Sequence, residues 1–253
     1  MKIVILAGGY GTRLAEYTDR VPKPMVNIGG KPILWHIMKS YAKYGFNDFI
    51  IALGYKSEII KEYFLNYNKL NSNFSIELKS NKITEHNNHT EDWKVTLVDT
   101  GLDTMTGGRL KRLRKYLGKE PFFATYGDGL SNINLKELIQ FHNGHGKLAT
   151  VSAVRPAARF GLLSLNKNIV TKFEEKPQTE AGRINGGFFV LDPKIIDYID
   201  NDESIWEREP LCNLAESGNL YAFKHDGFWQ CADTIRDLKY LEELFGENKA
   251  HWL

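Results

Sequence analysis

The first half of the chain repeats one pattern: a short apolar run stops at a glycine, and an amphipathic helical stretch follows. The apolar runs are residues 2–7, 49–53 and 122–126, which are short and apolar as buried parallel strands are. Residues 33–41 and 59–67 place apolar side chains at helical spacing. This alternation predicts an α/β fold with a Rossmann-like, doubly wound mixed sheet.

The second half of the chain has a different pattern. From about residue 148 onward, short alternating strands are mixed with three helical stretches, which predicts an α+β addition to the same sheet. Residues 70–106 are polar and predict short strands with exposed loops. Because no linker, repeat or low-complexity tract interrupts the sequence, we expect a single domain over residues 1–253 with a soft division near residue 130.

Composition excludes several classes of function. The chain carries 33 basic and 31 acidic residues, so its net charge of +2 creates no overall field that would attract nucleic acid. No stretch approaches the ~20 apolar residues of a membrane span, and the first apolar run is too short for an export signal. We therefore expect a cytoplasmic protein without nucleic-acid or membrane partners. Cys212 and Cys231 show no metal-ligand spacing and are expected to be reduced thiols.

A glycine-rich loop at residues 6–14 follows the first apolar run and reads Leu-Ala-Gly-Gly-Tyr-Gly-Thr-Arg-Leu. Glycines let the backbone turn tightly, so that its N–H groups can face a phosphate. The loop lacks the Gly-Lys-Ser/Thr ending of a Walker A motif, and Leu14 stands where a dinucleotide-binding fingerprint needs its third glycine. Taken alone, the loop fits a plain tight turn as well as a phosphate site.

A lysine between two prolines, Pro22-Lys23-Pro24, lies about ten residues beyond the loop. Each proline restricts the backbone, so Lys23 is presented stiffly, as suits a residue that contacts a phosphate during transfer. Taken alone, the pattern favours a solvated lysine in a turn. The combination of the two motifs is more informative than either.

Together, Gly8-Gly9-x-Gly11-Thr12-Arg13-Leu14 and Pro22-Lys23-Pro24-Met25 resemble the signature of the sugar-1-phosphate nucleotidyltransferases. Residues 30–38, 96–101 and 105–112 extend the resemblance along nearly the whole chain, toward the members of that family that transfer a cytidylyl group to glucose 1-phosphate. The resemblance implies the nucleotide-diphospho-sugar transferase fold. It also assigns nucleotide binding to about residues 1–130 and sugar-phosphate binding to about residues 131–253.

The nucleotide site follows from the same resemblance. In the family, the glycine loop wraps the triphosphate, and the lysine that matches Lys23 contacts the phosphates at the reacting centre. Arg13 and Lys23 are therefore the expected catalytic residues. The expected nucleotide-binding residues are Leu6, Ala7, Gly8, Gly9, Gly11, Thr12, Arg13, Lys23, Gly107, Gly108 and Arg109.

Two aspartates, Asp128 and Asp233, are implied by the resemblance to hold Mg²⁺. Asp128 follows an apolar strand, at the end where ligands of open α/β sheets bind. Carboxylates together with substrate phosphates are the ligands that Mg²⁺ prefers. Without the resemblance, Asp233 is at least as well explained as the N-cap of a helix predicted at 234–245. His86 and His89 lie in a hydrophilic stretch, which favours exposed chain over a metal site.

The sugar phosphate is assigned by resemblance alone. A lysine matching Lys176 binds the phosphate in the family, while residues matching Glu174 and Asn185 read sugar hydroxyls and a glycine matching Gly161 leaves room for the hexose. Each would be ordinary surface if seen alone. The expected sugar-phosphate-binding residues are thus Gly161, Glu174, Lys176 and Asn185.

The implied reaction is in-line attack by a phosphate oxygen of glucose 1-phosphate on the α-phosphorus of CTP, with Mg²⁺ assisting and pyrophosphate leaving. Because this nucleophile is already anionic near neutral pH, no triad or dedicated base is needed. Transfer of a uridylyl or thymidylyl group, or a silent nucleotide-sensing homologue, remains open. The resemblance also implies a homo-oligomer, and the strands expected within 70–106 could pair across subunits.

Overall fold

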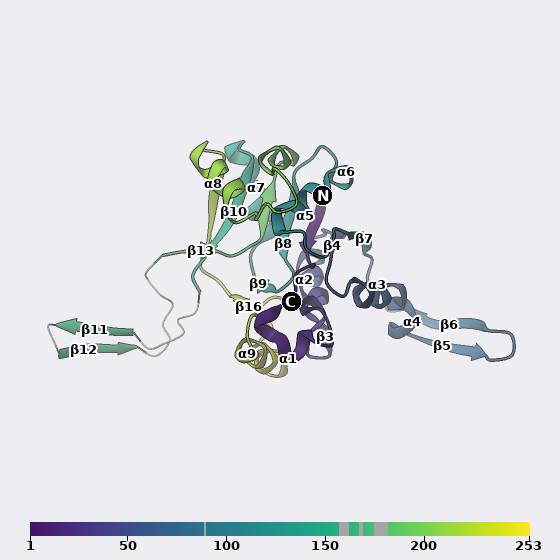
Figure 1. Cartoon of the computed structure of the whole chain (residues 1–253). Helices are drawn as coiled ribbons and strands as arrows, with labels where there is room; N and C mark the ends of the chain where they lie inside the picture. Colours follow the sequence, from purple (N-terminus) through teal and green to yellow (C-terminus); the bar gives the residue numbers. More distant parts are fainter. Residues whose placement is uncertain (89, 157–161, 167–168, 175–181) are drawn as a thin grey trace.

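The apolar runs form the centre of one mixed sheet in the computed structural model, which describes residues 1–88, 90–156, 162–166, 169–174 and 182–253 (Figure 1). Within these residues the sheet has eight strands. In spatial order they are β13 (Ile184–Asn185), β10 (Ala149–Val154), β14 (Phe189–Leu191), β8 (Phe122–Tyr126), β1 (Lys2–Leu6), β4 (Asp48–Leu53) and β7 (Lys94–Asp99), with β15 (Leu220–His225) beside β10.

The strand directions match the sequence patterns. Strands β8, β1, β4 and β7 are parallel neighbours, and β8, β1 and β4 contain the three apolar runs found in the first half of the sequence. Strands β14, β10 and β13 pair antiparallel and extend the sheet on the far side of β8. The doubly wound mixed α/β sheet expected from the sequence is confirmed.

Helices cover both faces of the sheet. Because successive side chains of a strand point to opposite faces, one strand contributes to two cores. In β1, Ile3 and Ile5 belong to one core and Val4 to the other, and all three are fully buried. The first core is covered by α2 (Ile33–Ala42), α3 (Ser57–Leu65), α7 (Leu135–His145) and α9 (Ile235–Gly246). The second is covered by α5 (Thr106–Arg112), α6 (Arg114–Leu117), the 3₁₀ helix η3 (Pro193–Tyr198) and α8 (Glu209–Glu216).

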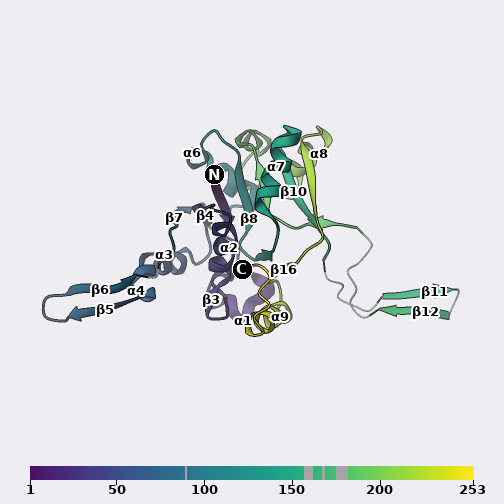
Figure 2. The same ribbon diagram turned by 180° about the vertical axis from the view of Figure 1, so that it is seen from behind.

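Two hairpins leave the sheet on opposite sides, as Figures 1 and 2 show from front and back. One hairpin follows α4 (Tyr67–Asn71) and consists of β5 (Ser72–Glu77) and β6 (Lys82–Asn88). The other consists of β11 (Leu162–Asn166) and β12 (Ile169–Glu174). Strands β5 and β6 lie within residues 70–106, where short strands were expected, and β6 includes part of the hydrophilic stretch around His86. There His86 lies within hydrogen-bond distance of Ser75 on β5 (Nε2 to Oγ, 2.8 Å), which places it in strand pairing.

Short elements complete the fold near the glycine loop. They are η1 (Thr12–Leu14), α1 (Ala15–Thr18), η2 (Lys23–Met25), β2 (Asn27–Ile28), β3 (Lys31–Pro32), β9 (Gly129–Ser131) and β16 (Trp229–Cys231). The sequence predicted a helix directly after the loop, whereas the chain makes only a 3₁₀ turn and one α-helical turn there. Among the described residues, no helix is both long and apolar enough to span a bilayer.

Candidate active site

A cavity of about 700 Å³ opens at the carboxyl ends of β1 and β8, where open α/β sheets bind their ligands. Most of the predicted site residues line it. They are Leu6, Ala7, Gly8, Gly9, Gly11, Thr12, Arg13, Lys23, Arg109, Asp128, Asn185 and Asp233. Gly107 and Gly108 are not in the lining.

The glycine loop owes its shape to Gly11. Its φ of +66° lies in the left-handed region, and a Cβ at this position would come within 2.7 Å of Thr18 Cγ2. From there the chain closes at once into η1, where the Leu14 amide donates to the Gly11 carbonyl (2.9 Å). The tight turn therefore places Thr12 and Arg13 at the cavity while Leu14 is buried in the core.

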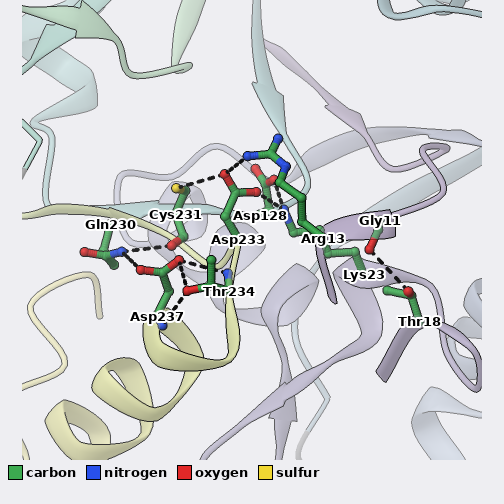
Figure 3. Close-up of polar contacts among 10 residues, drawn as sticks. All are labelled: Gly11, Arg13, Thr18, Lys23, Asp128, Gln230, Cys231, Asp233, Thr234 and Asp237. Carbon is green, nitrogen blue, oxygen red and sulfur yellow. Dashed lines mark hydrogen bonds and ion pairs between the residues drawn. The ribbon is translucent and has the colours of Figure 1, made fainter. Parts of the chain in front are cut away.

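Lys23 reaches the cavity because its segment packs closely against β8. Pro22 is extended, η2 starts at Lys23, and a Cβ on Gly127 would lie 2.8 Å from Pro24 Cγ, so only glycine allows this approach. The Lys23 ammonium lies 2.5 Å from Asp128 Oδ2 and 2.5 Å from Asp233 Oδ1 (Figure 3). These three charged side chains, called the Lys–Asp cluster below, are largely buried.

Strand pairing brings the two aspartates together. Asp128 precedes β9 and Asp233 follows β16, and β9 pairs antiparallel with β16 so that Cys231 lies opposite Gly129. The Ala232 amide also donates to the Asp128 carbonyl (2.9 Å). The N-cap of α9 is Thr234, which forms a capping box with Asp237. The N-cap interpretation of Asp233 is therefore wrong, and its carboxylate is left to face the cavity.

The charges in the Lys–Asp cluster support one another. Burial alone lowers the pKa of Lys23, but the two carboxylates outweigh it and the net pKa lies above the ordinary value. Burial alone raises the pKa of Asp233, yet hydrogen bonding and charge from Lys23, with the charge of Arg13, bring its net pKa below the ordinary value. Lys23 and Asp233 are therefore both charged at neutral pH.

Arg13 and Cys231 contact the same carboxylate from other sides. The exposed Arg13 guanidinium lies 2.5 Å from Asp233 Oδ2, and the Cys231 thiol lies 3.6 Å from that oxygen (Figure 3). Burial, followed by the nearby carboxylates, raises the pKa of Cys231 to about 12. Cys231 is therefore a protonated thiol that donates to Asp233, and not a nucleophile.

A divalent metal fits between the two aspartates. Among the described residues, no group of three or more His, Cys, Asp and Glu side chains forms a closed metal site. Two converging carboxylates with open space beside them suit Mg²⁺, which usually keeps waters or substrate phosphates as its other ligands. The ammonium of Lys23 already lies between Asp128 and Asp233, so the geometry suits a cation.

The Arg109 guanidinium is bound by oxygen atoms of the protein itself. It lines the cavity but is only 4% exposed, and both terminal nitrogens are engaged by protein oxygens. Its hydrogen bonds run to Leu53 O, Thr100 Oγ1, Gly101 O, Gly8 O and Leu102 O, at 2.7–3.1 Å. Burial and the neighbouring Arg112 lower the pKa of Arg109. Arg109 thus ties the glycine loop to the ends of β4 and β7.

Gly107 and Gly108, which the resemblance assigned to the nucleotide, pack against another part of the chain. The sequence suggested that they let a base approach the backbone, but a Cβ on Gly107 would lie 2.6 Å from the Ser204 carbonyl oxygen. A Cβ on Gly108 would lie 2.5 Å from the Asp202 carbonyl oxygen, and both amides donate to Ser204 O. The two glycines make room for the chain at 202–204 instead.

On the sugar side, only Asn185 can be placed. It lines the cavity, and its amide contacts Tyr126 and Gly187. Gly161 and Lys176 lie outside the described residues, and Glu174 is described only as the last residue of β12.

The cavity lining also includes residues without a predicted role, among them Thr106, Tyr126, Glu207 and Trp229. Tyr126 precedes Gly127-Asp128, so its position at the end of β8 was the one available signal. No motif surrounds Thr106 or Glu207, which come together only through the packing of α5 against the loop before α8. Trp229 donates from Nε1 to the Gly186 carbonyl (2.7 Å) and closes the cavity beside β13.

The fold, with the Lys–Asp cluster at the strand ends, suits an α/β protein that binds phosphates, and comparison with known proteins identifies its class. The family model described as "Nucleotidyl transferase" matches residues 2–238, and the chain belongs to that family. The chain is 54% identical to "Glucose-1-phosphate cytidylyltransferase" of Salmonella typhimurium (strain LT2), over 100% of this chain and 98% of the relative. "Probable glucose-1-phosphate cytidylyltransferase" of Bacillus subtilis (strain 168) is 45% identical over 100% and 99% of the two chains.

Solved structures agree on the fold. HddC from Yersinia pseudotuberculosis complexed with GMP-PN superposes with a TM-score of 0.72 and 27% identity, over 96% of this chain and 99% of that one. A UDP-glucose pyrophosphorylase complexed with UDP-glucose gives a TM-score of 0.69 at 19% identity, over 98% of each chain. The family expected from the sequence motifs is confirmed by the family model and by the two curated relatives.

Proposed function

We propose that the protein transfers a cytidylyl group from CTP to α-D-glucose 1-phosphate, giving CDP-glucose and pyrophosphate. The strongest support for this proposal is the 54% identity to a relative named for that activity, over 100% of this chain and 98% of the relative. The Lys–Asp cluster in a cavity at the strand ends provides the charges that such a transfer needs.

The chemistry requires two anions to meet. The attacking phosphate oxygen needs no base, so the task of the protein is to align the substrates and to offset their charge. We assign this task to Lys23 and Arg13, whose cationic groups converge on the same face of the cavity. The glycine loop presents backbone amides to the triphosphate.

Asp128 and Asp233 would hold Mg²⁺, and Cys231 would keep the Asp233 carboxylate oriented by donating to it. The ion supplies positive charge to phosphate oxygens when it is bound. Lys23 is placed to move from the carboxylates to a phosphate, since its side chain has three donors and a flexible stem. We infer the sugar subsite from Asn185, with Lys176 and Glu174 added by resemblance.

The direct test is pyrophosphate release by the purified protein with glucose 1-phosphate and Mg²⁺, using CTP, UTP, dTTP and GTP in separate reactions. We expect release with CTP only. Release with UTP or dTTP alone would keep the reaction class but reject the cytidylyl assignment. Tight CTP binding without release would favour a nucleotide-sensing role instead.

Two variants test the assigned site. Lys23→Ala and Asp128→Asn should fold normally and lose roughly 10²–10³-fold in turnover, as expected when one electrostatic contact to a transition state is removed. Near-normal turnover in either variant would reject the assigned site.

A further inference from the structure

The tip of the glycine loop, residues 8–11, makes few contacts through its own backbone. Its first residue is held, because the Gly8 carbonyl accepts from the Tyr55 amide (3.1 Å). The amides of residues 9–11 donate to no residue that the structure describes, which leaves them open to a ligand. A Cβ on Gly9 would meet nothing within 4 Å, so no described group packs against this part of the loop.

Tyr10 holds the middle of the tip through its side chain. Its hydroxyl donates to Asp103 Oδ1 (2.8 Å), and its ring lies 5.2 Å from the ring of Tyr55. Tyr55 is itself fixed, since its hydroxyl donates to the Thr18 carbonyl (3.2 Å). Tyr10 is 44% exposed, so these contacts, rather than burial in a core, hold the tip. The hydrogen bond with Asp103 raises the pKa of Tyr10, so the phenol is the donor near neutral pH.

Asp103 belongs to residues 102–105, a second segment of the cavity lining. The buried Arg109 joins this segment to the glycine loop, because it donates to Leu102 O (3.1 Å) and to Gly8 O (3.0 Å). The hydrogen bond from Tyr10 to Asp103 joins the same two segments again, through exposed side chains. The glycine loop is therefore tied to its neighbour at two places, one buried and one exposed.

We propose that Tyr10 is a positioning residue of the nucleotide site: by donating to Asp103, it keeps the glycine loop in the shape that presents its free amides to the triphosphate of CTP. The inference rests on the proposed function, because it takes CTP as the ligand of the loop. A loop that is already held in its binding conformation loses less conformational freedom when the ligand binds, so the affinity is higher.

The substitution Tyr10→Phe removes the hydroxyl and keeps the ring beside Tyr55. We expect the dissociation constant of CTP with Mg²⁺, measured by titration calorimetry without sugar phosphate, to rise roughly three- to tenfold, as for one lost hydrogen bond. The KM for glucose 1-phosphate should stay within about twofold of wild type, and the thermal unfolding midpoint within about 2 °C, because the lost bond is exposed. Tyr17→Phe, at an exposed tyrosine outside the cavity lining, is the control and should change neither constant.

A matched pair of variants at Asp103 separates the hydrogen bond from the negative charge. Asparagine is uncharged but still accepts from the Tyr10 hydroxyl, whereas leucine is uncharged, similar in size and unable to accept. We expect Asp103→Leu to bind CTP roughly three- to tenfold more weakly than Asp103→Asn. In the Tyr10→Phe background the two Asp103 variants should bind CTP equally, because the hydroxyl that distinguishes them is gone.

Three outcomes would overturn this inference while leaving the proposed function intact. An unchanged dissociation constant in Tyr10→Phe would mean that the loop needs no such tie. Equal binding by Asp103→Asn and Asp103→Leu would mean that Asp103 does not act as an acceptor. A Tyr10→Phe effect of full size in the Asp103→Leu background would place the hydroxyl on the nucleotide itself.

The proposed function is tested separately, by pyrophosphate release from wild type. CTP binding without release would reject the proposed function, and the dissociation constants of the variants would still decide the role of Tyr10. A wild-type protein that binds no CTP would overturn the proposed function and this inference together.

Discussion

At the scale of single residues, the Lys–Asp cluster shows what a sequence can and cannot reveal. The lysine lies 105 and 210 residues from its two partners along the chain, and the family resemblance placed all three in one site. The direct pairing of Lys23 with both carboxylates was not predicted, because it depends on how β9 and β16 pair. Similarly, no pattern in the sequence shows that residues 202–204 occupy the space beside Gly107 and Gly108.

We expect Lys23 to stabilise the fold through the Lys–Asp cluster, in addition to the catalytic role proposed above. Lys23→Met leaves two carboxylates facing each other, so we expect the free energy of unfolding at pH 7 to fall by roughly 1–3 kcal/mol. The lowered pKa of Asp233 means that its contribution is present above its ordinary pKa and is lost as pH falls through the folded value. The raised pKa of Lys23 means that its contribution is lost only in alkaline solution.

Urea unfolding at pH 7 and at pH 3, which lies below the ordinary pKa of Asp233, measures this effect, and the difference from wild type should be smaller at pH 3. Millimolar Mg²⁺ should stabilise Lys23→Met more than wild type at pH 7, because the metal can replace the missing ammonium. Lys119→Met, at an exposed lysine, is the control. A Mg²⁺ effect no larger than in wild type would argue against Asp128 and Asp233 as the metal ligands.

At the scale of elements, helix α7 is joined to β10 by a buried histidine. His142 Nδ1 and His145 Nε2 lie 2.9 Å and 2.7 Å from Thr150 Oγ1. Burial, with some repulsion from His145, lowers the pKa of His142 to about 4. The unfolded chain therefore takes up this proton at a higher pH than the folded one does.

The sign of the pH effect follows from this difference. Between the ordinary pKa of about 6.5 and the folded value the unfolded state binds more protons, so stability falls as pH falls. From pH 7 to pH 5, wild type should lose about 2 kcal/mol more than His142→Gln, which cannot titrate there. Chemical denaturation at the two pH values measures the loss, and parallel losses in both proteins would reject the assigned pKa.

The β5–β6 hairpin is the element that the sequence described least well. Its exposed apolar side chains Phe74, Ile76 and Ile83 fall on one face, since Ile76 is paired with Ile83 and Phe74 is two residues away. A two-stranded hairpin is marginally stable alone in water. We therefore retain the proposal that this hairpin pairs with another copy of the chain.

Shortening the hairpin tests that proposal. Residues 73–87 can be replaced by an Asn-Gly turn that joins Ser72 to Asn88, which lie opposite each other. Light scattering should give a mass above 29.0 kDa for wild type and a mass that falls toward this value for the shortened chain. Lys82→Ser, a polar change in the same hairpin, should keep the wild-type mass. An unchanged mass after shortening would place the subunit contact elsewhere.

At the scale of the whole molecule, the cavity is lined by both parts of the proposed division near residue 130. The glycine loop and Asp128 come from the first part, and Asn185 and Asp233 come from the second. The strand patterns were sufficient to predict the parallel centre of the sheet, because β1, β4 and β8 are buried on both faces and their sequences are correspondingly apolar.

A ligand that spans both parts should stabilise the whole fold. CTP with Mg²⁺ at about 100 times its dissociation constant should add about 2.7 kcal/mol to the free energy of unfolding, which corresponds to a rise of roughly 5–10 °C in the unfolding midpoint. Thermal unfolding with dTTP at the same concentration is the control and should give a smaller rise. Equal rises with both nucleotides would contradict selection of cytosine in the bound state.

The placement of Arg109 has a consequence for how this chain can evolve. A Cβ on Gly8 would lie 2.2 Å from Arg109 Nη1, and a Cβ on Gly54 would lie 2.5 Å from the same atom. Neither glycine can gain a side chain while the buried guanidinium holds its carbonyl partners, and a smaller residue at 109 would take a donor away from Gly101 O and Leu102 O. Gly8 can therefore change only after Arg109 has changed, whereas a Cβ on Gly54 would still lie 2.6 Å from the Gly8 carbonyl oxygen, so descendants of this chain should keep Gly54 whatever residue stands at 109.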